Sequence, residues 1–233
     1  MKRTMVFFPV IISGLLIPSC VSEKQSERPE LKNVIVLVGD DHSVKALGCY
    51  GNDIIRTPNI DRLAENSVRF TNAYSNAPVC SASRQSLLTG KYPHSTGVTL
   101  LTTAFRDEGN ITLAEVLLQN NFATAIVGKT HFNNYGEEIP PNHGFTMMAG
   151  HNERRKYLSE NPQPPVPDSI ETLGPWRPFK DHARVWLNAD VLPTATWADY
   201  GSAGWDAKKA IEFIRENKDN KFFLWVGFHE PHS

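Results

Sequence analysis

The sequence has 233 residues, of which 40% are hydrophobic and 21% are charged. This content excludes a disordered chain and is enough for a substantial core, either one domain or the front half of a larger one. The net charge of −1 excludes a general attraction to nucleic acid or to an anionic membrane surface. Any binding of an anion must therefore depend on a local group of side chains.

Residues 1–20 have the pattern of an export signal. Lys2 and Arg3 give a positive start, and an apolar run too short to cross a bilayer leads to small residues before Cys20. The pattern resembles a bacterial lipoprotein signal, in which the cysteine is lipidated, and an ordinary signal peptide cleaved nearby is the alternative. We expect an exported bacterial lipoprotein of the periplasm or the outer-membrane or cell surface, held by its lipid anchor alone, with residues 21–30 as a polar tether.

The segment NVIVLVGDD, from Asn33 to Asp41, is a run of branched apolar residues that stops at two carboxylates. It predicts a strand buried on both faces, in the middle of a parallel sheet. Side chains at the carboxyl end of such a strand reach the crevice where α/β proteins place their chemistry. Asp40 and Asp41 repel each other unless a cation lies between them. A hard divalent ion with oxygen ligands is one explanation, and a solvated turn or helix cap is the alternative.

Three helical segments are predicted next. TPNIDRLAENSVRF places Ile60, Leu63 and Ala64 on one face, SASRQSLLTG ends at Gly90, and ITLAEVLLQNN has apolar residues at helical spacing. The strands FATAIVGKTH and KFFLWVGFHEPHS follow, with the amphipathic helix GWDAKKAIEFIRENKDN before the second of them. The order predicts a doubly wound, three-layer α/β/α sandwich, with polar residues gathered along one edge of the sheet.

Residues 137–205 are rich in Pro, Trp and Asn. They predict long loops and short helices that shape the mouth of a pocket. The tryptophans offer flat faces for stacking on sugars, and core packing is the alternative role. The tryptophans in question are Trp176, Trp186, Trp197 and Trp205.

The three cysteines are Cys20, Cys49 and Cys80. Cys49, in LGCYG, is predicted to be a small buried hydrophobe, and a disulfide with Cys80 is the alternative. Cys80 comes just before a predicted helix, whose first amides favour anions, and Arg84 returns on the same helix face. As a thiolate Cys80 is a nucleophile, but a hard, oxygen-ligated cation pairs poorly with sulfur.

Basic side chains follow the second and third strands. Lys129 and His131 end one strand, and His229 and His232 end the other. Lone histidines are usually structural, but their recurrence at strand ends favours a shared site. Beside a metal-bound carboxylate pair they form an electropositive place suited to phosphate or sulfate.

These motifs together resemble a known family. CSASR followed by LLTG resembles the signature of type I sulfatases, and GDDH, TPNIDRLA, GKTH and FHEPH stand in the order and spacing typical of that family. The resemblance runs from Asn33 to the end of the chain. It implies an alkaline-phosphatase-like fold, incomplete at the C-terminus, with residues 31–233 as the N-terminal part of the catalytic domain. The glycosaminoglycan branch, which includes iduronate-2-sulfatase and sulfamidase, looks most similar.

The resemblance implies that Cys80 is oxidised to formylglycine (3-oxoalanine) by a formylglycine-generating or anaerobic sulfatase-maturating enzyme. One hydroxyl of the hydrated aldehyde attacks sulfur and displaces the alcohol or amine, and the other then expels sulfate. An oxygen nucleophile also suits a hard cation, whereas a disulfide with Cys49 would block the conversion. Ala82 replaces the commoner proline of the signature, so the oxidation depends on a suitable maturation enzyme.

The family's roles carry over by position. Arg84 and Lys129 match the groups that hold the nucleophile and the sulfate oxygens. His131 matches the base that assists release of sulfate, and His232 matches the residue near the leaving group. Lys129 and His232 would also bind substrate, and His229 is a weaker candidate for that contact.

The metal implied by the resemblance is Ca²⁺, with Mg²⁺ less favoured. Asp40, Asp41 and modified Cys80 resemble three of its ligands. The family draws further ligands and another basic residue from sequence beyond Ser233, so residues 1–233 alone are expected to be poorly active.

The expected activity is hydrolysis of sulfuric esters on sulfated carbohydrate, with glycosaminoglycan as the first candidate and no nucleic-acid partner. A phosphomonoester or phosphonate hydrolase of the same superfamily is one alternative. An inactive, truncated binding protein is the other.

Overall fold

The computed structural model describes residues 32–134, 142–162 and 201–232. The predicted signal and tether, Cys20 with its predicted lipidation, and Trp176, Trp186 and Trp197 lie outside the described residues. Within the described ranges, no helix has the length and apolar character needed to span a bilayer.

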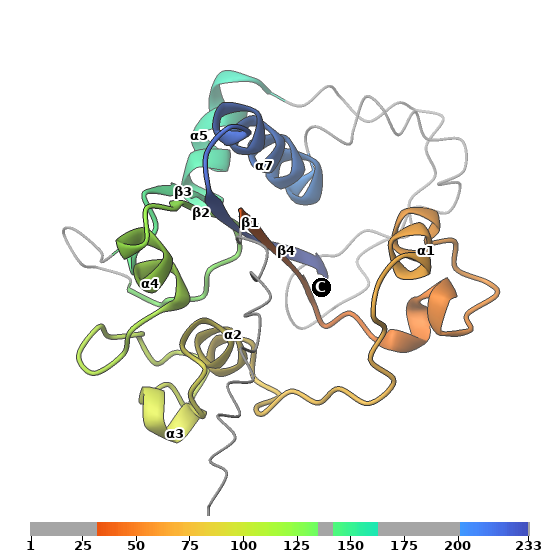
Figure 1. The fold of residues 1–233 in the computed structure, drawn as a ribbon, viewed down its shortest axis with the longest axis horizontal. Helices are drawn as coiled ribbons and strands as arrows, with labels where there is room; N and C mark the ends of the chain where they lie inside the picture. Colours follow the sequence, from red (N-terminus) through yellow and green to blue (C-terminus); the bar gives the residue numbers. More distant parts are fainter. Residues whose placement is uncertain (1–31, 135–141, 163–200, 233) are drawn as a thin grey trace, which may run out of the picture. The chain divides into compact units, whose positions relative to one another are not determined.

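Four parallel strands form a sheet with the order β1-β4-β2-β3 (Figure 1). Their bounds are Asn33–Asp40 (β1), Ala123–Gly128 (β2), Met147–Ala149 (β3) and Phe222–Pro231 (β4). The three strands predicted from the sequence are therefore confirmed. The short β3 is an addition, since its three residues give too little pattern to predict a strand.

Helices fill the connections between strands, as parallel pairing requires. Thr112 begins α4 with a capping box, because its hydroxyl accepts from the backbone N–H of Glu115 and the Glu115 carboxylate accepts from the N–H of Thr112. Gly90 ends α2 in the left-handed conformation that glycine adopts readily. The helices are α1 (Pro58–Glu65), α2 (Cys80–Thr89), α3 (Pro93–Thr96), α4 (Leu113–Gln119), α5 (His151–Glu160) and α7 (Ser202–Asn217), and η1 (Val44–Ala46) and η2 (Gly48–Tyr50) are single 3₁₀ turns.

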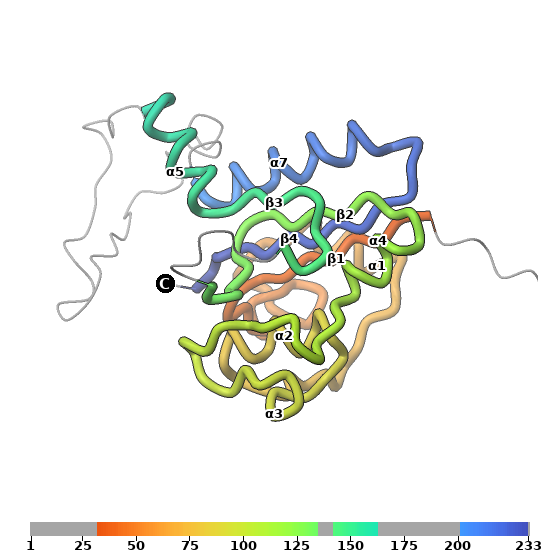
Figure 2. Tube along the Cα trace, turned by 90° about the vertical axis from the view of Figure 1, so that its left-hand side faces the viewer, coloured from red at the N-terminus to blue at the C-terminus, as the bar shows by residue number. Residues whose placement is uncertain are grey.

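The sheet has a separate apolar core on each face. On the face that we call the α2 face, Phe223 and Trp225 of β4 pack with residues of α2 and α4. On the opposite α7 face, Leu224 and Val226 of the same strand pack with Trp205 and other residues of α7. Figure 2 shows α7 and α5 on one side of the strands and α2 with α3 on the other. The alternation of β4 confirms the predicted three-layer α/β/α arrangement.

The prediction that β1 is buried on both faces is wrong for the described structure. β1 lies at the edge of the sheet and pairs only with β4 among the described strands. Its α2 face packs through Val34, Val36 and Val38, whereas Ile35 and Leu37 on the other face are 48% and 61% exposed. A run of branched residues thus predicted the strand correctly but not how many of its faces are covered.

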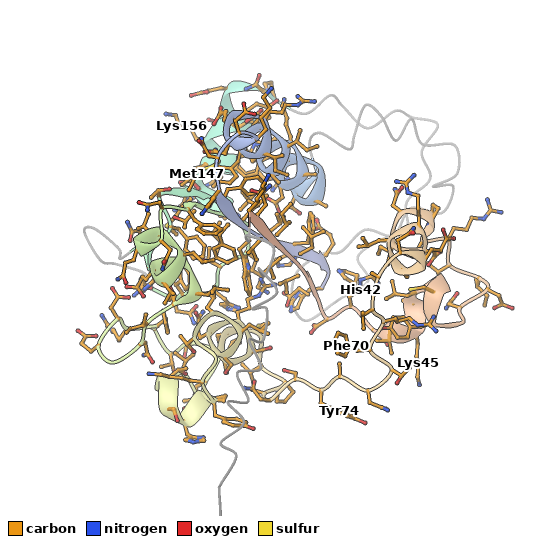
Figure 3. All side chains as sticks on the ribbon, viewed as in Figure 1. His42, Lys45, Phe70, Tyr74, Met147 and Lys156 are labelled. Carbon is orange, nitrogen blue, oxygen red and sulfur yellow. The ribbon has the colours of Figure 1, made fainter. Side chains whose placement is uncertain are left out.

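The region between β1 and α2 is less buried than its sequence suggests. Cys49 is half-buried rather than enclosed, and the apolar face predicted for α1 leaves Leu63 64% exposed. Figure 3 marks Phe70 and Tyr74 on the chain that leads from α1 to α2, and both side chains are exposed. By contrast, Trp205 is 2% exposed, so its role is core packing and not stacking on a sugar.

Candidate active site

The carboxyl ends of β1, β2 and β4 lie at the same edge of the sheet because the strands are parallel. Asp40 ends β1 and accepts a hydrogen bond from Nζ of Lys129, which follows β2. From the end of β4, His232 brings Nε2 within 3.7 Å of the carboxylate of Asp41. The structure therefore brings together residues that lie almost 200 positions apart in the chain, as the strand-end motifs predicted.

Arg84 contacts these strand ends from the α2 face of the sheet. Its side chain is buried, and Nη1 donates to the backbone oxygen of Lys129 at 2.8 Å while Nη2 donates to that of Phe228 at 3.3 Å. Nη2 also lies 3.5 Å from Oδ1 of Asp40. A Cβ at Gly227 would come within 2.6 Å of Nη1, so glycine is needed there for the guanidinium to lie against the sheet.

Asp40 is an ionised carboxylate in a buried place. Burial alone would raise its pKa, but the hydrogen bond from Lys129 and the charge of Arg84 outweigh burial and lower the pKa below the usual range. The side chain of Asp40 is 6% exposed and that of Lys129 is 15% exposed. Removal of either cation would leave this charge without adequate compensation.

His131 is neutral at physiological pH. Burial lowers its pKa to about 4, with the positive charges of Lys129 and Arg84 adding to the effect. A neutral imidazole has one nitrogen free to accept a proton, which suits the role of base that the resemblance implies. Its backbone has a positive φ of 59°, so the surrounding structure must hold the residue in this unfavourable conformation.

The histidines of β4 lie beside each other. The rings of His229 and His232 have centroids 5.1 Å apart in an edge-to-face arrangement. Burial, followed by the charge of Lys129, lowers the pKa of His229. Both histidines thus lie within the electrostatic reach of the strand-end cluster, as the sequence predicted.

Cys80 is the first residue of α2 and so lies one position further into the helix than predicted. Val79 precedes it and provides no side-chain cap, so the first amides of the helix keep their capacity to bind an anion. Cys80 is half-buried, and both it and Cys49 are free thiols. The alternative of a Cys49–Cys80 disulfide is therefore wrong.

Asp40 and Asp41 supply the hard oxygen donors that Ca²⁺ prefers. Across the described residues, however, no group of three or more His, Cys, Asp or Glu side chains is arranged to hold a metal ion. Asp40 is instead paired with Lys129 and Arg84, and Asp41 faces His232. These residues alone do not complete a calcium site, and we assign no catalytic step to a metal.

Two further buried polar residues could not be predicted from the sequence. Gln85 is fully buried, and its Nε2 donates to the backbone oxygen of His131 at 3.0 Å. Asp206 of α7 is 4% exposed, and its carboxylate lies so close to Gly128 that a Cβ there would be 2.7 Å from Oδ2. Gln85 follows Arg84 directly, and Asp206 stands between buried positions of an amphipathic helix, which are the only signals for them in the sequence.

Several buried polar atoms at this edge have no hydrogen-bond partner within the described part of the chain. They are Nε of Arg84, Oε1 of Gln85, Nδ1 of His131 and Nδ1 of His232. Buried polar atoms are normally satisfied, so a group of unsatisfied ones is typical of a place that receives water or a polar ligand. The edge of the sheet thus combines the buried cation of Arg84, the half-buried cation of Lys129, a neutral histidine and unsatisfied polar atoms.

Comparisons with known proteins identify the family of the chain. The family model described as Sulfatase matches residues 32–233. The chain belongs to the sulfatase family. It is 33% identical over 226 residues to an N-acetylglucosamine-6-O-sulfatase of Bacteroides thetaiotaomicron, covering 95% of this chain and 34% of that relative. It is 30% identical to human iduronate 2-sulfatase over 241 residues, covering 99% of this chain and 40% of that protein.

Solved structures support the fold. A structure described as a complex with D-glucosamine-2-N,6-O-disulfate matches with a TM-score of 0.57 and 26% identity, covering 87% of this chain and 35% of that one. The phosphonate monoester hydrolase of Agrobacterium radiobacter matches with a TM-score of 0.65 and 21% identity, covering 87% and 41%. The expected alkaline-phosphatase-like α/β fold is confirmed. The chain spans 34% and 40% of the lengths of the two curated relatives named above.

Proposed function

We propose that the protein hydrolyses sulfuric esters of sulfated carbohydrate, with glycosaminoglycan as the substrate class. The observation that carries the proposal is the placement of Lys129, Arg84 and a neutral His131 around one sheet edge, in a chain of the sulfatase family. The relatives support the choice of substrate, because those compared above are named for sulfated amino sugars and iduronate.

Cys80 is the residue that we propose to be converted to formylglycine. It begins α2 and has a free thiol, and its oxidation to an aldehyde requires a thiol that is not held in a disulfide. When present, the hydrated aldehyde supplies an oxygen nucleophile and a second hydroxyl for release of sulfate. A formylglycine-generating or anaerobic sulfatase-maturating enzyme is therefore the proposed partner.

The remaining residues act on charge and protons. Lys129 and Arg84 offset the negative charge of sulfate, and the burial of Arg84 reduces the screening of its charge by water. His131 accepts a proton, because its pKa of about 4 leaves it neutral at pH 7. His232 is placed near the leaving group and His229 contacts the sugar in this proposal.

Ca²⁺, rather than Mg²⁺, is the proposed metal, with Asp40, Asp41 and modified Cys80 among its ligands. Ca²⁺ takes about six to eight oxygen ligands, so these residues need others to complete the site. We accordingly expect residues 1–233 alone to release sulfate far more slowly than the complete protein. Rates of sulfate release from both proteins would measure this difference, and equilibrium dialysis of both against ⁴⁵Ca²⁺ would show whether weaker calcium binding accompanies it.

Residues 1–20 are proposed to be a lipoprotein signal, with lipidation at Cys20 and residues 21–30 as the tether. The catalytic domain, of which residues 31–233 form the N-terminal part, would then lie in the periplasm or at the cell surface. Glycosaminoglycan chains are too large to cross the inner membrane, so export of the enzyme fits the proposed substrate. Palmitate labelling of the wild type and of Cys20→Ser would test the anchor.

The deciding experiment compares the complete protein with its Cys80→Ala variant, both made with a maturation enzyme. Mass spectrometry of the peptide containing Cys80 should show formylglycine in the wild type, and sulfate release from 6-O-sulfated glucosamine should fall by roughly 10³-fold or more in the variant. Rates on an aryl phosphate, measured beside an aryl sulfate, separate sulfate from phosphate hydrolysis. An intact thiol together with no release of sulfate would rule the proposal out.

A further inference from the structure

Gln85 holds the backbone of the histidine that we propose as the base. Its side chain has no exposed surface, and Nε2 donates to the carbonyl oxygen of His131 at 3.0 Å. That carbonyl can only accept, so the amide must present its NH₂ group to it and turn Oε1 away. Oε1 is buried and has no partner within the described ranges. An amide that uses only its donor is costly in a core, because its oxygen stays unsatisfied, so the bond to the carbonyl of His131 must offset that cost.

The conformation of His131 explains what this donor does. His131 has a φ of 59°, in the left-handed region that a residue with a Cβ occupies only when its surroundings enforce it. The next residues are held independently, because the oxygen of Phe132 accepts from the N–H of Phe105 at 2.8 Å and Asn133 donates to the oxygen of Leu101 at 2.7 Å. Within the described residues, the carbonyl oxygen of His131 accepts its hydrogen bond from Gln85.

Gln85 and Arg84 are consecutive on α2, and each binds different backbone oxygens at the strand ends. Arg84 binds the backbone oxygens of Lys129 and Phe228, and Gln85 binds that of His131. One turn of α2 therefore fixes the backbone of two of the three strand ends. The helix that begins with Cys80 sets the position of the proposed base relative to the proposed nucleophile.

We propose that Gln85 is a positioning residue, which fixes the left-handed backbone of His131 and thereby places its imidazole for proton transfer in the site that begins at Cys80. This inference rests on the proposed function for its catalytic consequence. Its structural part, the restraint of His131 by Gln85, can be measured without any sulfatase activity.

The test replaces Gln85 by methionine, which has nearly the same shape and no donor. The matched control is Ser86→Ala, since Ser86 is also buried in α2 and its hydroxyl has no partner among the described residues. Both variants are made in the complete, matured protein. Melting temperature, amide hydrogen exchange over residues 129–134, and kcat and KM on an aryl sulfate are then compared with wild type.

Gln85→Met should raise amide exchange at residues 130–132 by roughly tenfold or more while exchange in α4 and β4 stays at the wild-type level. It should lower kcat by roughly 10- to 100-fold with KM changed less than about threefold, because a displaced base affects the transition state and not binding. Ser86→Ala should match wild type in all three measurements.

The proposal is wrong if exchange at residues 130–132 does not rise, or if it rises equally across the whole fold, which would show a loss of stability alone. It is also wrong if kcat of Gln85→Met equals that of wild type. If the wild type releases no sulfate, the proposed function fails, and the exchange measurement still decides whether Gln85 restrains His131.

Discussion

The two faces of the sheet each bury an aspartate near the carboxyl ends of the strands, yet the two carboxyls differ in charge. Asp40 on the α2 face is 5% exposed and Asp206 on the α7 face is 4% exposed. The pKa of Asp40 lies below its usual value, whereas that of Asp206 is raised to about 7. Equal burial thus gives an ionised group on one face and a partly protonated one on the other.

The partners of each carboxyl explain the difference. Asp40 receives a hydrogen bond from Lys129 and the charge of Arg84, which together exceed the cost of burial. For Asp206, burial raises the pKa first, the like charge of Glu230 raises it further, and Arg154 opposes only in part. The sheet therefore keeps cations on the face that carries the proposed chemistry and a proton on the other.

The largest expected effect comes from removing a cation from the α2 face. Lys129→Met should destabilise the fold by about 3 kcal/mol, because it leaves the buried charge of Asp40 poorly compensated. Urea unfolding at pH 7 measures this loss. The double variant Asp40→Asn with Lys129→Met should recover more than half of it, since the uncompensated charge is gone. Additive losses in the double variant would show that the two side chains do not interact, contrary to the contact in the structure.

On the α7 face, by contrast, replacing the buried aspartate should stabilise the protein relative to wild type as the pH rises. Because the pKa of Asp206 is raised from 3.8 to about 7, the unfolded chain loses this proton first as the pH rises. The contribution of Asp206 to the stability of the wild type therefore falls between about pH 4 and pH 7. Asp206→Asn avoids this fall, so its stability relative to wild type should be about 2 kcal/mol better at pH 8 than at pH 5.

The control for this variant is Asp219→Asn, whose side chain is 86% exposed just beyond α7. It should show the same difference from wild type at both pH values. An Asp206→Asn variant whose relative stability is independent of pH would mean that Asp206 is ionised like Asp40, and the contrast between the faces would be lost.

A smaller effect is expected from the neutral histidine beside the cations. His131 gains a proton in the unfolded chain near pH 6.5, but in the folded protein only near pH 4. Its contribution to stability is therefore complete above pH 6.5 and is lost as the pH falls toward 4, by about 1 kcal/mol after allowance for its partial exposure. His131→Gln should remove that part of the acid sensitivity between pH 7 and pH 5. The exposed His94→Gln is the control, and it should retain the wild-type acid sensitivity.

The charged face was the more predictable of the two. Asp40, Lys129, His131 and His232 each end a recognisable strand, and parallel strands bring their carboxyl ends together, so the sequence was sufficient to group them. Arg84 followed from the signature that begins at Cys80. Their predicted roles as metal ligands or catalytic groups remain predictions.

The buried partners could not be predicted in the same way. The hydrogen bond from Gln85 to His131 depends on how α2 packs against the sheet. The sequence shows a polar residue inside a helix, but it does not show which backbone group that residue contacts. Aspartate is a residue type common at solvent-exposed helix positions. The absence of a side chain at Gly128, however, lets Asp206 lie against the sheet. Burial of this kind is set by tertiary contacts and not by periodicity.

β1 gives the smallest expected effect and tests the same division between faces without any charge. Val36 packs on the α2 face, whereas its neighbour Leu37 is 61% exposed on the α7 side. In residues 1–233, Val36→Ala should cost about 1 kcal/mol and Leu37→Ala less than about 0.5 kcal/mol, although leucine loses more atoms. Denaturant unfolding of the two variants measures both costs. If the same Leu37→Ala change costs about 2 kcal/mol or more in the longer protein that we propose, a further layer covers the α7 side of β1 there. Equal, small costs in both proteins would instead show that this side of β1 stays open to solvent.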